Sequence, residues 1–328
     1  MEDFAQRRRQ KYIDEDAYKN TLKHFSEQEP YYQEFLRQPE PHIRGHARVL
    51  SSRALDLWDV FQLRYTAGEN LDELARSLDG IVGAYDRYVK KNQETPAEDY
   101  LPPFRMIDMI DTYVDFLNMV SAAVLLHRED LLPMIFSWIK NGEYDGIDAV
   151  LEELLNFYFP DRPSPDQWLW KKPYEMLLAV IDAPSAAERP ALMRKYVKNW
   201  YPAMKGKAAF WGKHAEITPD FSPYFGYWAM CAGAFTYLFG IDDTSYRDEE
   251  VYPRDLVDYA RRFSRRPVKL EDGTEILRVE GGQPCLRDGR WFSPAKSDSA
   301  RYFKAGEIMP VFEASEYGQT IWQWSHGA

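Results

Sequence analysis

The chain has 328 residues, of which 45% are hydrophobic, 28% charged and 15% aromatic, and its formal net charge is −11. A chain of this length and composition can bury a core without cross-links, and the cysteines at 231 and 285 are too few for a disulfide framework. The N-terminus does not resemble a signal peptide, and no apolar run is long enough to cross a membrane. We therefore expect a cytoplasmic protein, with neither nucleic acid nor membrane as a partner, because phosphate binding needs a basic surface.

Helical periodicity dominates the first 260 residues. Apolar side chains recur three and four positions apart from Leu71 to Val89, and Asn70 is a suitable N-cap for that helix. A second, more apolar helix is expected from Phe104 to Leu126. Further helices are expected at 42–66, 129–140, 146–158, 173–182, 185–204, 222–239 and 253–263.

The sequence pattern changes after residue 265. Short alternating runs surround Asp272-Gly273, which is a strong hairpin signal, and glycine and proline are frequent in the rest of the chain. The fold class predicted is mainly α, a multi-helix bundle with a small β-rich C-terminal appendage. The domains expected are an N-terminal helical domain over 1–128, a C-terminal helical domain over 129–265 and the appendage over 266–328.

Motifs for catalysis or metal binding are missing from the sequence. It has no phosphate-binding glycine loop, HExxH, paired CxxC or G-x-S-x-G. His42 and His46 are spaced as two metal ligands on a helix could be, but no acid completes the site. Asp108, Asp111 and Asp115 share a helix face, and such a stripe more often pairs with arginines. We predict no catalytic residue, no metal and no cofactor, and that the protein is not an enzyme.

The most distinctive stretch runs from residue 210 to residue 258. An aromatic-rich segment is followed by a helix, by the helix-ending Gly240, and by a turn rich in acids. Residues 241–258 hold seven acidic and two basic side chains, a local charge of 2 − 7 = −5. The aspartates directly after Gly240 could cap the next helix or could face a partner, and the residues alone leave both readings open.

The same stretch resembles the C-terminal helical domain of bacterial polymorphic-toxin immunity proteins. The family pattern is aromatic-Gly-x-His, then Tyr-x-Gly-Tyr-Trp, then Ile-Asp-Asp-Ser/Thr, then Tyr-Pro-x-Asp-Leu-Val. The residues that match the pattern and are expected to be structural are Trp211, His214, Tyr224, Gly226, Tyr227, Trp228, Tyr252, Pro253 and Asp255. The resemblance is best over 130–263 and weaker before it, and Cys231 stands where the family usually has a glutamate.

This resemblance implies a protein that binds and occludes a cognate toxin. The best-known members neutralise nuclease toxins delivered by type VI secretion or related contact-dependent systems. A nuclease presents a basic cleft, so acids in the turn are the expected toxin contacts. These are Asp242, Asp243, Asp248, Glu249 and Glu250.

Other functions remain compatible with the sequence. An adaptor or chaperone that loads a secreted effector would also be acidic, helical and non-catalytic. An enzyme that reverses the damage done by a toxin is a further alternative. The sequence does not predict an oligomeric state.

Overall fold

The computed structural model describes residues 3–40, 44–96, 98–159, 162–262 and, with gaps at 270–274, 277, 294–295, 297–298 and 313–319, residues 268–325. His42 and the Asp272-Gly273 turn, both singled out in the sequence, lie outside the described residues. Within the described part of the chain, no helix is both long enough and apolar enough to span a membrane.

Contacts divide the chain into two compact units, each assembled from separate stretches of sequence. The first contains residues 1–116, 134–138 and 205–227, and the second contains residues 117–133, 139–204 and 228–328. The domains expected from the sequence, with boundaries at 128 and 265, stay a prediction. Helices α5 (Ile110–Leu125) and α6 (Leu132–Ser137) contribute residues to both units.

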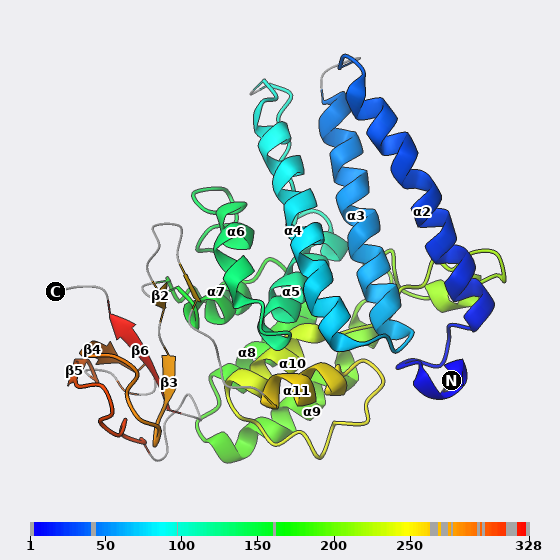
Figure 1. Cartoon of the computed structure of the whole chain (residues 1–328). Helices are drawn as coiled ribbons and strands as arrows, with labels where there is room; N and C mark the ends of the chain where they lie inside the picture. The colour runs from blue at the N-terminus through cyan, green and yellow to red at the C-terminus, as the bar shows by residue number, and fades with distance from the viewer. Residues whose placement is uncertain are drawn as a thin grey trace. The chain divides into compact units, whose positions relative to one another are not determined.

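The first unit is built on three long helices, α2, α3 and α4, which run side by side (Figure 1). Helix α2 was not among the helices expected from the sequence, because few of its residues are buried and Pro30 lies within it. Asp14 starts α2 by accepting a hydrogen bond from Ala17 N at 2.8 Å. The other elements of this unit are short. The helices of the unit are α1 (Phe4–Arg7), α2 (Glu15–Arg37), α3 (Gly45–Thr66), α4 (Leu71–Gln93) and η3 (Lys213–Glu216).

The predicted start of α4 is correct, whereas the predicted start of α5 lies too early in the chain. Asn70 caps α4 by accepting hydrogen bonds from the backbone N–H groups of Asp72 and Glu73 at 2.9 and 3.2 Å, which confirms the predicted cap. Helix α5 was expected from residue 104 but begins at Ile110. Arg105 has a φ of 41°, which no α-helix tolerates, so the chain turns there first.

The second unit packs shorter helices, among which α10 and α11 are in contact. The expected start of α10 near residue 222 is wrong, because the chain is non-helical up to Ala229 and Gly226 has a φ of 124°. The helices of this unit are η1 (Glu129–Leu131), α7 (Ala149–Asn156), α8 (Lys171–Ile181), η2 (Ala186–Glu188), α9 (Arg189–Ala203), α10 (Met230–Leu238) and α11 (Arg254–Arg261).

The end of the chain forms antiparallel strands. In the described part of 268–325, four strands form one sheet in the order β3-β6-β4-β5, and its core includes the buried Trp291, Phe303 and Trp322. A separate pair, β1 and β2, aligns Val268 with Ile276, as the predicted hairpin requires. The strands are β1 (Val268–Lys269), β2 (Glu275–Ile276), β3 (Arg278–Glu280), β4 (Gly289–Phe292), β5 (Arg301–Phe303) and β6 (Ile321–Ser325). A mainly α fold with a small β-containing C-terminal region is therefore confirmed.

Two helical glycines provide a matched test of this packing. A Cβ at Gly233 in α10 would lie 2.7 Å from Pro253 Cγ and 3.1 Å from Val257 Cγ2, whereas a Cβ at Gly80 in α4 would meet nothing within 4 Å. We expect Gly233→Ala to lower the free energy of unfolding by about 1–3 kcal/mol through overpacking. Gly80→Ala should raise it by about 0.5–1 kcal/mol. Urea unfolding measures both, and equal effects of the two substitutions would contradict the close approach of α10 and α11.

Candidate functional site

Residues 241–258, hereafter the acidic segment, connect α10 with α11 and include the first turns of α11. Gly240 ends α10 with a φ of 63°, and Ile241 N donates back to Thr236 O at 2.9 Å. This left-handed C-terminal turn is one that glycine adopts without strain. Helix α10 therefore ends in a tight turn, and Asp242 and Asp243 follow Gly240 within three residues.

Asp243 is the structural centre of the acidic segment. Its buried carboxylate accepts hydrogen bonds from Arg247 Nη1, Arg261 Nη1 and the Tyr252 hydroxyl, each at 3.1 Å. Arg261 also donates to Ile241 O at 2.9 Å, and Arg247 binds Asp258. Asp243 was expected to contact a toxin, but its burial and its donors leave the carboxylate little surface for a partner. With these three donors, Asp243 links the turn to α11.

The other acids of the segment are more accessible. Asp242 is exposed, and its carboxylate accepts hydrogen bonds from the backbone and hydroxyl of Thr244 at 3.0 and 2.6 Å. These two bonds lower the pKa of Asp242, because they favour the charged form. The side chain of Asp248 is 88% exposed and pairs with Arg254, Glu249 lies 3.4 Å from Lys198, and Glu250 is exposed. Asp242, Asp248 and Glu250 therefore present their charge to solvent.

Buried tyrosines line the inner side of the segment. Tyr246 and Tyr252 pack edge to face with ring centroids 5.0 Å apart, and the Tyr246 hydroxyl lies 3.0 Å from Thr236 Oγ1. Burial raises the pKa of both phenols. Pro253 is buried and Asp255 is half-buried at the start of α11. The Tyr-Pro-x-Asp part of the motif therefore anchors α11.

The remaining motif residues fall on either side of the boundary between the two units. In the first unit, Gln10 pairs with the backbone of Tyr227, donating to its carbonyl at 2.8 Å and accepting from its N–H at 2.9 Å. The Tyr227 hydroxyl lies 2.8 Å from His214 Nδ1, and Tyr224 packs against Tyr227 with centroids 4.7 Å apart. Trp211 is half-buried, and Lys205 Nζ lies over its indole ring, 5.3 Å from the ring centroid.

In the second unit, the side-chain amide of Asn118 pairs with the backbone of residues 228–230, as that of Gln10 does with Tyr227 in the first unit. Its amide donates to Trp228 O at 3.0 Å and accepts from Met230 N at 3.1 Å. Trp228 is buried. Sequence reasoning missed both Gln10 and Asn118, because each lies more than a hundred residues from its partner and an isolated amide gives no local signal.

Cys231, at the position where the resemblance implies a glutamate, is buried in α10. Its sulfur lies 3.2 Å from the Tyr196 hydroxyl, and burial raises the pKa of the thiol to about 11. A thiol in this environment stays protonated at neutral pH and acts as packing.

The three aspartates at the start of α5 have different partners. Asp108 is exposed and pairs with Arg105 at 3.0 Å, and Asp111 accepts from Phe210 N at 3.2 Å. Asp115 accepts from Trp58 Nε1 at 2.9 Å, yet burial raises its pKa to about 7. Among the described residues, no group of three or more His, Cys, Asp or Glu side chains could hold a metal ion.

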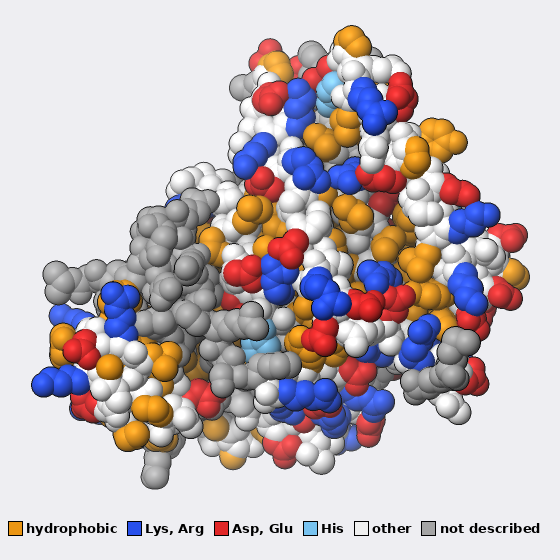
Figure 2. Space-filling model, viewed as in Figure 1, with side chains coloured by type: hydrophobic (Ala, Val, Ile, Leu, Met, Phe, Trp, Pro, Cys, Tyr) orange, Lys and Arg blue, Asp and Glu red, His pale blue; other side chains and the backbone are white. Residues whose placement is uncertain are grey.

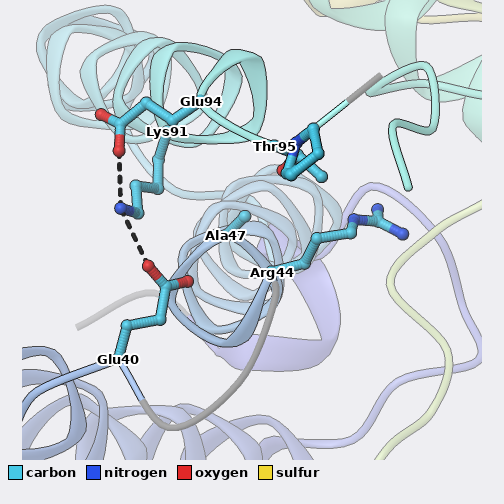
Figure 3. A pocket seen from close by; sticks show the side chains of 7 residues that line it. Glu40, Arg44, Ala47, Lys91, Glu94 and Thr95 are labelled. Atoms are coloured by element: carbon cyan, nitrogen blue, oxygen red, sulfur yellow. Dashed lines mark hydrogen bonds and ion pairs between the residues drawn. The ribbon is translucent and has the colours of Figure 1, made fainter. Parts of the chain in front are cut away.

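A pocket of about 380 Å³ opens where α3 begins and α4 ends (Figure 3). Lys91 lies between two carboxylates on one side of it, 3.0 Å from Glu40 and 2.6 Å from Glu94. The Arg44 side chain points away from this ion-pair group, past Thr95. None of the motif residues lines the pocket.

The central role of Asp243 predicts a large effect of neutralising it. Asp243→Asn leaves two guanidinium groups without their shared carboxylate, so the free energy of unfolding should fall by about 2–4 kcal/mol. Asp248→Asn, at an exposed position, should change it by less than about 0.5 kcal/mol. Urea unfolding of both variants measures the difference, and equal stability would show that Asp243 does not hold the turn.

The raised pKa of Asp115 predicts a pH dependence of stability. Its pKa of about 7 lies above the ordinary value of 3.8, so the folded state favours the protonated form and loses stability as pH rises toward 7. Between pH 5.5 and 8 the wild type should lose about 2 kcal/mol relative to Asp115→Asn, which cannot titrate there. Thermal and urea unfolding across this pH range measure the free energy of unfolding of both proteins. A difference between them that does not change with pH would contradict the raised pKa of Asp115.

Comparisons with known proteins bear on this site. Residues 146–256 match the family model described as PoNe immunity proteins (PoNi), C-terminal, a range that includes every motif residue and most of the acidic segment. The crystal structure of protein PA2201 from Pseudomonas aeruginosa is similar with a TM-score of 0.59 and 20% identity, covering 78% of this chain and 91% of that chain. At this identity the similarity concerns the fold alone. No curated protein matches the chain. Over residues 146–256, therefore, the chain is similar to the C-terminal part of a family of toxin-immunity proteins.

Proposed function

We propose that this protein is an immunity protein that binds a cognate toxin, a nuclease delivered by type VI secretion, and blocks it without catalysis. The observation that carries the proposal is the match of residues 146–256 to the C-terminal part of PoNe immunity proteins. The matched range includes most of the acidic segment, which holds seven acids against two bases over residues 241–258.

Electrostatics supports a basic partner. A net charge of −11 repels nucleic acid and attracts a protein with a basic cleft, which speeds association. On the face drawn in Figure 2, acidic and basic side chains are interspersed over α2, α3 and α4, without a uniform acidic surface there. A local excess such as the acidic segment is therefore the better candidate for steering the toxin.

We assign the toxin contacts to the accessible acids and give Asp243 a supporting role. The exposed Asp242, Asp248 and Glu250 would face the partner, together with the half-buried Glu249. Asp243, together with Arg247 and Arg261, would hold them in one arrangement before binding. A turn ordered in advance loses less conformational entropy when it binds, which favours affinity.

Charge reversal tests this assignment. Asp242→Lys, Asp248→Lys and Glu250→Lys combined should weaken binding to the product of the gene immediately upstream, the expected toxin, by tenfold or more and abolish protection of cells that express it. The matched control is Asp16→Lys, Glu27→Lys and Glu34→Lys on the exposed face of α2, which changes the net charge equally.

The two triple variants separate local from general electrostatics. Biolayer interferometry gives the affinity, and survival on co-expression gives protection. Equal weakening by both variants would show that only net charge matters, and full protection by the acidic-segment variant would place the interface elsewhere. Binding to the delivery region of the effector, with no binding to its toxic domain, would favour an adaptor instead.

A further inference from the structure

The pocket between the start of α3 and the end of α4 takes no part in the proposed function. Its volume is about 380 Å³, which is in the range of small-molecule sites. Its described lining residues all belong to the first unit and lie before residue 146, where the match to immunity proteins begins. A ligand bound here would therefore be separate from the acidic segment.

Three of the four charged side chains that line the pocket are paired with one another. Lys91 Nζ lies 3.0 Å from a Glu40 oxygen and 2.6 Å from a Glu94 oxygen. The bond to Lys91, followed by one from His46 N, lowers the pKa of Glu40. The bonds to Glu94 and Glu40 raise the pKa of Lys91. With one cation and two carboxylates, this side of the pocket has a formal charge of 1 − 2 = −1.

Arg44 is the fourth charged side chain of the pocket, and it has no counter-ion. In the part of the chain that the structure describes, its guanidinium forms no ion pair, and its Nε is shielded from solvent without a hydrogen-bond acceptor. Figure 3 shows the side chain extending away from Lys91 and past Thr95, so the carboxylates beside Lys91 do not neutralise it. A shielded donor without an acceptor costs free energy, which a ligand that accepts its hydrogen bond would recover.

The backbone at Arg44 does not explain why an arginine stands there. Its φ is 65°, in the left-handed region that glycine and asparagine adopt more readily than residues with a longer side chain. Arg44 is also the N-cap residue of α3, yet its side chain caps no backbone N–H. Neither the turn nor the cap requires a guanidinium, so the side chain is available for another role.

The charges of the pocket select the ligand. A guanidinium donates two parallel hydrogen bonds to a carboxylate or a phosphate. The formal charge of −1 around Lys91 repels a second negative charge, which disfavours phosphate and favours a group with a single charge. Ala47 and Pro96 add an apolar part to the lining, which suits a small organic acid.

We propose that this pocket binds a monocarboxylate through the guanidinium of Arg44. The inference goes beyond the proposed function, because it places a ligand site in the first unit. A free organic acid and the C-terminal carboxylate of a peptide present the same chemistry to Arg44, and the experiment separates these two sources.

The test titrates the full chain with acetate at neutral pH and follows the Arg44 Nε–H resonance by NMR. A saturable shift is expected in the wild type, because the shielded N–H gains an acceptor. Arg44→Asn should weaken acetate binding tenfold or more without lowering the melting temperature of the free protein, because asparagine tolerates a positive φ. Arg48→Gln, which removes an exposed arginine on the next turn of α3, is the matched control and should bind acetate as the wild type does.

Other results would overturn the proposal. Acetate binding that survives in Arg44→Asn, or that is lost equally in Arg48→Gln, would remove Arg44 as the ligand-binding group. Tighter binding of inorganic phosphate than of acetate would contradict the preference for a single charge. A melting temperature lowered in both Arg44→Asn and Arg44→Lys, with no saturable shift in the wild type, would assign Arg44 a structural role only.

Two further probes identify the source of the carboxylate. N-acetylglycine carries the carboxylate of a peptide C-terminus, and N-acetylglycinamide lacks it. Tenfold tighter binding of N-acetylglycine than of acetate, with no binding of the amide, would support a peptide C-terminus. Equal binding of the two acids, again with no binding of the amide, would support a free organic acid. Binding of the amide as tight as that of the acid would contradict a carboxylate site.

Discussion

The shared carboxylate of Asp243 is the interaction on which the candidate site depends. It joins Arg247 within the turn, Arg261 at the end of α11 and Tyr252 at its beginning, and so ties the turn to the helix that follows. Without it, Arg261 and Arg247 would lose the carboxylate that they share, and Arg247 would keep Asp258 as a partner, so the turn would be tied less firmly to α11. Gly233 in α10 also helps to position α11, because its lack of a side chain lets Pro253, at the start of α11, pack against it.

The acids of this chain fall into two physical classes. Asp243 is buried and compensated by arginines, so its charge is used within the fold. For Asp59 on α3, burial and the charges of Asp115 and Asp56 raise the pKa well above the ordinary value, so the charged form is disfavoured in the folded state. A charge of the first kind stabilises the fold, whereas a charge of the second kind costs free energy in the folded state. The net charge of −11 alone distinguishes neither class.

Local signals predicted much of the fold, and long-range contacts account for what they missed. The cap at Asn70 and the β1–β2 hairpin follow from neighbouring residues and were found. The start of α10 was placed too early, because the aromatic spacing of 222–229 looks helical although Gly226 has a φ of 124°. The acidic turn after Gly240 was identified, but the burial of Asp243 depends on Arg261, eighteen residues away, and could not be read from its surroundings. That the acids contact a toxin stays a prediction.

A stoichiometric titration tests most directly whether this protein occludes a toxin. The purified protein is added in steps to the purified product of the gene immediately upstream, the expected toxin, and the remaining toxin activity is measured at each step. Occlusion predicts a linear fall that ends at a fixed molar ratio, with a complex of that composition on a sizing column. Loss of activity at far lower ratios would indicate an enzyme acting on the toxin. Undiminished activity at excess protein, with cells still protected, would indicate repair of the damage and contradict occlusion.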